Sequence, residues 1–371
     1  MIVEMFKIMI FLLFPSLYFL ISVFNLKSKV DKLLYFCTIL VIIICYNPME
    51  TSDFWRIKFL YEKIKEYTFI ETLKLKIDFI IPITMYFFNK LGLPFKFFLV
   101  YSYIYYGVII NIFKNKLNSK KYMIVFLGFA IFSSTMMILE NPRSPLATVS
   151  FIYAILLPNK FTKQKNLLLL ISIFLHLSYL PLVLLALISK IKFKSLPKIL
   201  YILSFTFIIF DINLGDIIIK LISIMRIENY YINLKIQTYL LDLNRVEGVG
   251  KINWFYYLHN FYFIFFGIYI LFERKKGDYL QNSMFLLLSF VNLFFHLKTI
   301  FYRYMVSMFL LEIIYIAKRY SENELRLKKI IIYLHILLLL YSMIMWVRIL
   351  ASGYQSMDWL NNLVFIIFKI S

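Results

Sequence analysis

The sequence has few of the residues that build metal and cofactor sites. It contains two cysteines and four histidines, and no Cys/His cluster has the spacing of metal ligands. Cys37 and Cys45 lie in one apolar stretch, about 12 Å apart if it is helical, which is too far for a disulfide. We therefore expect no metal and no cofactor. Internal repeats and Gly- or Pro-rich linkers are also absent from the sequence, so residues 1–371 are predicted to form a single domain.

Acidic residues are scarce as well, with 20 against 41 lysines and arginines and a net charge of +21. In a soluble protein this excess would suggest nucleic acid as a partner. Hydrophobic residues, however, make up 62% of the chain and aromatic residues 20%, whereas a soluble domain is usually about 45–50% apolar. Lipid must then be the solvent for much of the chain, and the positive-inside bias of membrane proteins accounts for the lysines. We predict an all-α, polytopic integral membrane protein that binds no nucleic acid.

Six short lysine-rich segments set the predicted topology. They hold 22 of the 41 basic residues and only five of the 20 acids, which favours a cytoplasmic position for residues 25–32, 114–121, 158–165, 190–198, 273–278 and 318–329. Spans must then come in pairs between them, which gives about 10–12 transmembrane helices with both termini outside. The predicted spans lie near residues 5–24, 33–46, 95–113, 122–139, 145–158, 166–178, 179–190, 196–210, 254–272, 283–298, 304–318 and 328–349.

Two of these assignments rest on local features. No small-residue cleavage site follows residues 5–24, so we expect a retained span rather than a signal peptide. Residues 166–189 fit either one ordinary span or two half-length helices with a break at Pro181. We favour the broken pair, because a single span would move residues 190–198 to the outside.

Two long segments, 46–94 and 211–253, fall on the outer side in this topology. In the first, apolar residues recur at three- and four-residue steps from Leu60 to Ile77, with Lys63, Lys65, Glu66 and Lys74 on the other face. This pattern predicts an amphipathic helix lying on the outer leaflet. Long loops are often functional, and these two hold most of the polar residues outside the cytoplasmic segments.

The arginines are distributed differently from the lysines. Three of the nine lie in the cytoplasmic segments and six lie on the outer side. A guanidinium binds phosphate bidentately and stays charged, so an outward arginine indicates an anionic ligand. Arg143 and Arg303, each at the outer mouth of an apolar span, are the main candidates, and Arg245 lies in the second outer loop. The alternative for Arg143 is a snorkelling side chain paired with Glu140, and for Arg303 an interfacial anchor.

Two further residues are candidates for acid–base chemistry. His176 lies in an apolar stretch and reaches the outer boundary under the broken-pair topology, although a lone histidine there is more often a hydrogen-bonded core residue. Asp53 directly follows the predicted span 33–46, and its alternative role is that of a helix N-cap.

Four stretches in order along the chain resemble the EpsG family of bacterial exopolysaccharide proteins, which are similar in function to the Wzy O-antigen polymerases. These stretches are Asp53-Phe-Trp-Arg, the segment from Glu71 to Gly92-Leu-Pro, Arg143-Ser-Pro-Leu-Ala followed by Phe174-Leu-His-Leu-Ser, and Arg303-Tyr-Met. The resemblance runs through nearly the whole chain.

The resemblance implies a membrane glycosyltransferase that polymerises oligosaccharide repeat units carried on polyprenyl diphosphate, at the outer face of the bacterial cytoplasmic membrane. Arg143, Arg303 and Arg245 would bind the diphosphate, and His176 or Asp53 would be the general base. A flippase and a chain-length regulator are the implied protein partners. Two other functions fit the sequence: a flippase for the lipid-linked oligosaccharide, and an acyltransferase that modifies the glycan.

Overall fold

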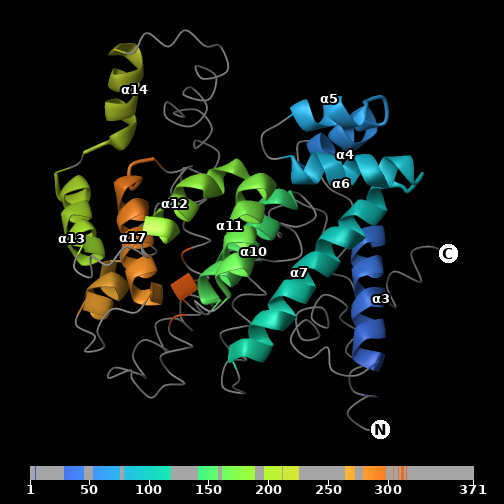
Figure 1. The fold of residues 1–371 in the computed structure, drawn as a ribbon, viewed down its shortest axis with the longest axis horizontal. Helices are drawn as coiled ribbons and strands as arrows, with labels where there is room; N and C mark the ends of the chain where they lie inside the picture. The colour runs from blue at the N-terminus through green and yellow to red at the C-terminus, as the bar shows by residue number, and fades with distance from the viewer. Residues whose placement is uncertain are drawn as a thin grey trace. The chain divides into compact units, whose positions relative to one another are not determined.

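A computed structural model describes nine stretches of the chain: residues 29–45, 53–75, 79–117, 141–157, 161–188, 196–210, 212–224, 264–271 and 279–297. It also describes Met5, Tyr304, Met308, Leu311, Glu312 and Tyr315. The regular structure of these residues is helical and contains no strand (Figure 1), which confirms the all-α prediction. Predicted spans 5–24, 122–139 and 328–349 lie outside the described stretches.

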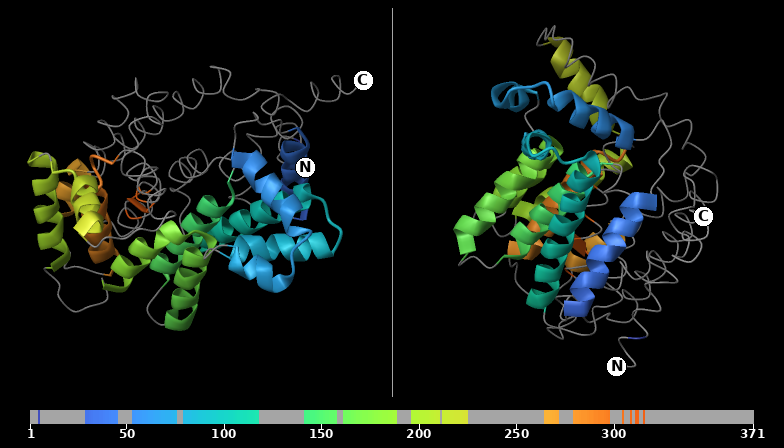
Figure 2. Two further views of the ribbon diagram at one scale, coloured as in Figure 1. Left: turned by 90° about the horizontal axis from the view of Figure 1, so that it is seen from above. Right: turned by 90° about the vertical axis from the view of Figure 1, so that its right-hand side faces the viewer.

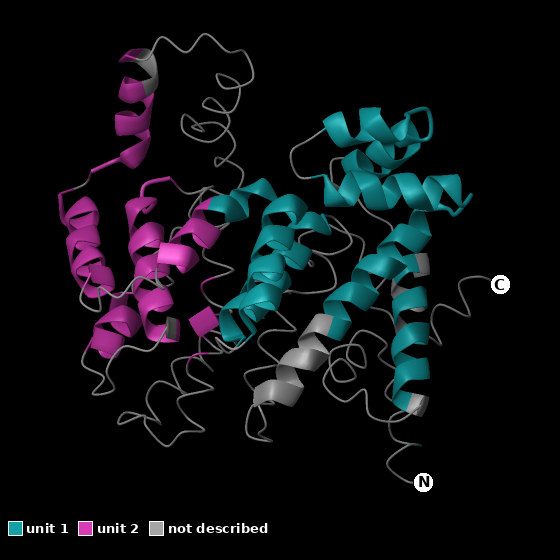
Figure 3. Cartoon of the chain, viewed as in Figure 1, with its two compact units in different colours: residues 1–180, 316–371 teal, residues 181–315 magenta. Residues whose placement is uncertain are grey.

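The residues cluster into two compact units (Figure 3), Met1–Leu180 with Ile316–Ser371, and Pro181–Tyr315. Unit 1 contains α3 (Lys29–Cys45), α4 (Asp53–Ile64), α5 (Phe69–Lys74), α6 (Ile80–Lys90), α7 (Phe95–Leu117), α10 (Arg143–Leu156), α11 (Thr162–Leu175) and the short 3-10 helix η3 (Leu177–Tyr179). Unit 2 contains α12 (Leu180–Ile188) from its second residue, α13 (Leu196–Ile209), α14 (Leu214–Ile224), helical residues 264–271 and α17 (Tyr279–Leu293).

Helix α10 is the core helix of unit 1. Ten of its 14 residues are buried, because the segment is apolar around its whole circumference and packs against α7 and α11. Prolines define both of its ends. Pro142 is the N-cap, where a missing N–H costs nothing, and Leu157 has extended backbone because it precedes Pro158 and the α region is disfavoured there.

Helices α3 and α7 of unit 1 pack against each other (Figure 2). Gly107 of α7 lies at this contact. The Tyr35 hydroxyl donates to the carbonyl oxygen of Tyr103, 3.2 Å away, and the tyrosine ring lies over Gly107. A Cβ added at Gly107 would lie 1.9 Å from the Tyr35 Oη. A larger residue at position 107 would therefore displace the Tyr35 side chain.

The predicted amphipathic helix from residue 60 to residue 77 is wrong as a continuous element. Helix α4 ends at Ile64, a turn follows, and α5 begins at Phe69. The reason is a second helix start: Thr68 and Glu71 form a capping box. The Thr68 hydroxyl accepts from the Glu71 backbone N–H at 3.3 Å, and the Glu71 carboxylate accepts from the Thr68 backbone N–H at 2.8 Å.

The capping box also affects titration of the glutamate. Hydrogen bonds from the backbone N–H and then the hydroxyl of Thr68 lower the pKa of the Glu71 carboxyl. A lowered pKa in the folded state means that this contribution to stability is present above the unfolded pKa and is lost as the pH falls through the folded pKa.

The apolar residues of this segment differ in burial. Ile64 is buried, but Ile70 is 63% exposed and Leu73 is exposed as well. The buried stripe lies one turn earlier, on α4, and consists of Phe54, Ile57, Tyr61 and Ile64. It packs on the start of α7, where the Phe54 and Phe95 ring centroids are 5.4 Å apart.

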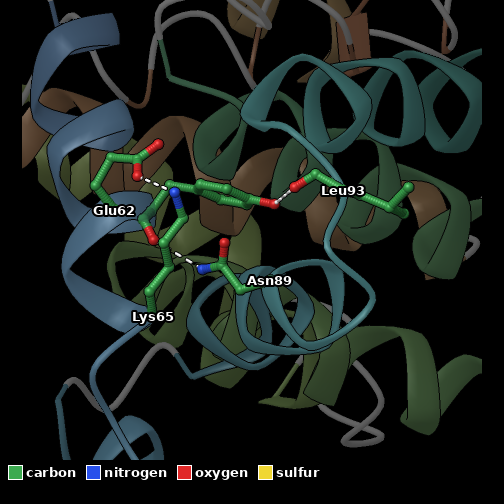
Figure 4. Close-up of polar contacts among 5 residues, drawn as sticks. Glu62, Lys65, Asn89 and Leu93 are labelled. Atoms are coloured by element: carbon green, nitrogen blue, oxygen red, sulfur yellow. Dashed lines mark hydrogen bonds and ion pairs between the residues drawn. The ribbon is translucent and has the colours of Figure 1, made fainter.

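Two hydrogen bonds of Tyr61 link α4 to the end of α6 (Figure 4). Its hydroxyl donates to the carbonyl oxygen of Leu93 at 2.6 Å, and its own carbonyl oxygen accepts from the Asn89 side-chain amide at 2.8 Å. Helix α6 ends in a Schellman motif, in which the Leu93 N–H donates to the Phe88 carbonyl and the Gly92 N–H donates to the Asn89 carbonyl, both at 3.0 Å. Gly92 has a φ of 68°, which favours glycine.

The predicted break within residues 166–189 exists, but its position differs from the prediction. The chain leaves α11 at His176, which has extended backbone (φ −156°, ψ 112°), five residues before Pro181. Pro181 instead lies in the first turn of α12, where proline is tolerated because an N–H there has no partner within the helix.

In unit 2, α13 packs against α17 around a buried tyrosine. The Tyr201 hydroxyl donates to the Ile264 carbonyl at 3.1 Å, and its ring lies 5.6 Å from that of Phe285. A buried amide of Asn292 donates to Ser204 Oγ at 2.9 Å across the same pair of helices. The predicted outer loop 211–253 contains α14, and residues 225–253 lie outside the described stretches.

Within the described residues, no single helix combines the length and hydropathy that a membrane span needs. One pair of the described helices has the length and composition of a membrane span only when the two are taken together. These helices are Leu196–Ile209 and Leu214–Leu221, and the angle between them at the break is 93°.

The α3–α7 contact generates a test of this packing. We expect Gly107→Ala to destabilise the protein by about 1–3 kcal/mol, because the Tyr35 ring must move. In a Tyr35→Leu background the same change should stabilise by up to about 1 kcal/mol, because the obstructing ring is gone and alanine favours a helix over glycine. Thermal denaturation of the four purified proteins measures both effects. An equal effect of Gly107→Ala in the two backgrounds would contradict the contact.

Candidate functional site

The first predicted anion ligand, Arg143, is the first residue of α10. Its side chain is half-buried, and its Nε donates to Asn141 Oδ1 at 3.2 Å. No side chain caps the N-terminus of α10. The first-turn N–H groups of a helix and its dipole favour negative charge at this end. The guanidinium of Arg143 and the N-terminus of α10 therefore both favour an anionic ligand. The alternative partner, Glu140, lies outside the described residues.

His176 lies at the junction of two helices. It is the C-cap of α11 and the N-cap of η3, and its side chain is half-buried. The Nδ1 atom accepts a hydrogen bond from the Ser178 backbone N–H at 3.2 Å and lies 2.7 Å from Ser178 Oγ. The side chain thus acts as a helix cap and holds the imidazole against the following turn.

A buried pair of hydroxyls connects this turn to α10. The Thr148 hydroxyl donates to the Ser144 carbonyl at 2.8 Å, so its oxygen accepts from the Tyr179 hydroxyl. Both side chains are at least 96% buried, and the Tyr179 ring contacts Phe151 with centroids 5.7 Å apart. The η3 turn is thereby attached to the first turns of α10, the same part of the helix that begins with Arg143.

Helix α7 contacts α10, and helix α6 contacts α11. From α7, the Tyr105 hydroxyl is hydrogen-bonded to Ser150 Oγ at 2.7 Å. At the start of α6, the ring of Phe79 lies 4.5 Å from that of Phe174, two residues before His176. The segment 46–94 therefore contacts the end of α11 that carries the histidine.

We call this arrangement the α10–η3 site; its residues are Asn141, Arg143, Thr148, His176, Ser178 and Tyr179. It contains two of the five residues predicted from sequence, Arg143 and His176. Asp53 is the first residue of α4, and its side chain lies outside the described part of the structure. Arg245 and Arg303 also lie outside the described residues, and their roles stay predictions.

The buried hydroxyl pair of the site, Thr148 and Tyr179, is not among the residues predicted from sequence, and Ser178 enters there only through the family resemblance. Thr148 and Tyr179 lie in apolar stretches, where a buried hydroxyl requires a hydrogen-bond partner, and this requirement is the signal that points to them. Among the described residues no group of three or more His, Cys, Asp or Glu is placed to hold a metal ion. The guanidinium of Arg143 is suited instead to an anionic ligand such as a phosphate.

The described chain is thus an all-α protein whose polar site combines an arginine at a helix N-terminus with a histidine at a helix break. Comparison with known families then identifies it further: the model of the EpsG family matches residues 47–362, which include all five predicted site residues. The chain belongs to the EpsG family, which is associated with polysaccharide biosynthesis and whose proteins are typically membrane-associated. No match is found among curated proteins or among solved structures.

The hydroxyl pair predicts an order of stabilities. Tyr179→Phe should cost about 0.5–1.5 kcal/mol, because Thr148 keeps its bond to the Ser144 carbonyl. Thr148→Val should cost more, about 1–3 kcal/mol, because the Tyr179 hydroxyl then loses its buried acceptor. The double variant should be less impaired than the sum of the two. Thermal denaturation of the purified proteins gives the order, and additive losses would mean that the two hydroxyls do not interact.

Proposed function

We propose that this protein polymerises oligosaccharide repeat units carried on polyprenyl diphosphate into surface polysaccharide, as a multi-pass protein of the bacterial cytoplasmic membrane acting at its outer face. The reaction is a glycosyl transfer of the Wzy type. The observation that carries the proposal is the α10–η3 site, in which the Thr148–Tyr179 hydrogen bond attaches the turn that follows His176 to the helix that begins with Arg143. The chain that carries this site belongs to the EpsG family.

The surface of the described helices supports a membrane location. Large apolar side chains of α13 are exposed over much of its length, among them Ile199, Ile202, Leu203 and Ile209 at 48%, 55%, 54% and 72%. Contiguous apolar surface of this kind is rare on soluble monomers and is the surface that lipid covers. The lysine distribution supports the outward direction of Arg143, since it assigns residues 158–165, after α10, to the cytoplasm.

The chemistry of the donor explains the need for an arginine. When the acceptor hydroxyl attacks the anomeric carbon, the bond to the diphosphate breaks and negative charge grows on the leaving group. We assign the stabilisation of that charge to the guanidinium at the start of α10, together with the helix end. Arg303 and Arg245 are the further candidates for diphosphate contacts, and His176 and Asp53 for the acceptor's base. A flippase and a chain-length regulator are the proposed protein partners.

A second candidate function, acyl transfer onto the glycan, has one observation in its favour. Ser178 Oγ lies 2.7 Å from His176 Nδ1, a distance typical of a nucleophile beside its base. Ser178→Ala separates the two functions: it removes the nucleophile that acyl transfer requires, whereas the polymerase keeps both Arg143 and the imidazole.

Deletion of the gene tests the proposed reaction. The mutant should still build and export single lipid-linked units, so the surface glycan should fall from a ladder of lengths to one unit or none, as seen by gel profiling. Loss of a flippase would instead leave the lipid-linked unit inaccessible from outside, and loss of an acyltransferase would leave chain lengths unchanged. An unaltered ladder rules out the polymerase.

The role of Arg143 predicts a specific substitution pattern. Arg143→Lys keeps the charge but loses the bidentate fork. Polymer formation by the purified protein should fall at least tenfold in both Arg143→Lys and Arg143→Ala, because a hydrogen bond to a charged group contributes about 1.5–3 kcal/mol. Lys96→Arg, on α7, is a matched control that preserves charge away from the site. Full activity in Arg143→Lys would leave only a snorkelling role for the arginine.

A further inference from the structure

Within the proposed function, which this inference assumes, we infer that His176 is a hydrogen-bond donor to the diphosphate of the lipid-linked substrate, through its Nε2–H, and is not the general base. The assignment follows from which of the two ring nitrogens carries the hydrogen. It removes one of the two candidates for the base and gives the histidine the same ligand as Arg143.

The backbone of Ser178 determines the tautomer. A backbone N–H can only donate, and that of Ser178 lies 3.2 Å from His176 Nδ1. Nδ1 must therefore carry a lone pair rather than a hydrogen. Because a neutral imidazole has one N–H, the hydrogen is on Nε2. The Ser178 hydroxyl, 2.7 Å from Nδ1, donates to the same lone pair.

The imidazole is held in this orientation by the fold. His176 caps η3 with its side chain, and its carbonyl oxygen accepts from the Tyr179 N–H at 3.0 Å. The Tyr179 ring lies against the imidazole, with centroids 6.4 Å apart, and its hydroxyl is bonded to Thr148. The cap and the ring contact together fix which nitrogen faces the turn.

This tautomer suits a donor and not a base. A general base needs a lone pair directed at the acceptor hydroxyl, and the lone pair of His176 is directed at Ser178. Phosphoryl oxygens only accept hydrogen bonds, so an Nε2–H complements them as the guanidinium of Arg143 does. No proton moves to or from the histidine.

The balance of the reaction is consistent with this role. The acceptor oxygen forms a bond to the anomeric carbon, and the bond from that carbon to the diphosphate oxygen breaks. Its electron pair stays on the polyprenyl diphosphate, where the Nε2–H and the guanidinium bind the growing charge. The proton of the acceptor hydroxyl passes to a base other than His176, for which Asp53 is the remaining predicted candidate.

Two amide substitutions at His176 distinguish a donor from a base. The Gln amide nitrogen reaches roughly the position of Nε2 and the Asn nitrogen that of Nδ1, and neither side chain can accept a proton at neutral pH. We expect His176→Gln to keep polymer formation within a few-fold of wild type, and His176→Asn and His176→Ala to lose at least tenfold. His296→Gln is the matched control, since its Nε2 atom is 3.3 Å from the Phe207 carbonyl in unit 2 and a glutamine can still donate there.

A binding measurement separates this inference from the proposed function. Thermal shift of the full-length protein with a sugar-free polyprenyl diphosphate should show weaker binding in His176→Ala and near wild-type binding in His176→Gln. If the wild-type protein makes no polymer, the proposed function is wrong. The thermal-shift measurement still tests whether His176 donates a hydrogen bond to the diphosphate. If His176→Gln is as inactive as His176→Ala while diphosphate binding is unchanged, His176 is a base. If activity and binding are unchanged in all variants, His176 has no role in the reaction. Either result overturns the inference.

The tautomer itself can be observed in the wild-type protein, with one variant used only to assign the signals. The chain has four histidines, so nitrogen-15 histidine labelling gives a small set of ring signals, and the set lost in His176→Gln belongs to His176. We expect an unprotonated Nδ1 and a protonated Nε2. The reverse pattern would overturn the assignment.

Discussion

The hydrogen bond between the Tyr179 and Thr148 hydroxyls is the interaction on which the candidate site depends. Both side chains are buried, in surroundings where a hydroxyl without a partner is costly. Because the Thr148 hydroxyl already donates to the Ser144 carbonyl, it can only accept from Tyr179. The Tyr179 hydroxyl is therefore the donor of the bond between the two residues. The η3 turn, with its histidine, is thereby attached to the first turns of α10, which begins with Arg143.

The break at His176 provides a polar position in an otherwise apolar stretch. A continuous helix through residues 166–189 would bond the Ser178 backbone N–H to a carbonyl four residues earlier. Because the backbone of His176 is extended, the Ser178 N–H does not make that helical bond and donates to His176 Nδ1 instead. The same feature therefore ends α11, starts η3 and determines which nitrogen of the ring carries the hydrogen.

Local sequence signals were reliable where one interaction dominated. Prolines lie at both ends of α10, and Gly92 lies at the end of α6. They failed where two signals competed. The apolar spacing from Leu60 onward favoured one long helix, but the Thr68–Glu71 capping box starts a new helix inside it. Pro181 does not form the predicted break, because proline is compatible with the first turn of a helix, and the break lies at His176.

By itself, the sequence determined the helical class and the family resemblance, because apolar composition and the order of short motifs do not depend on the fold. Arg143 and His176 remain predicted site residues. Only the tertiary structure decided how the helices that carry Arg143 and His176 are attached to each other. Thr148 and Tyr179 are 31 positions apart, and Tyr105 and Ser150 are 45 apart, so no local pattern relates them. Their pairing follows from the packing of α10 between α7 and α11, which brings the Tyr105 and Tyr179 hydroxyls to Ser150 and Thr148.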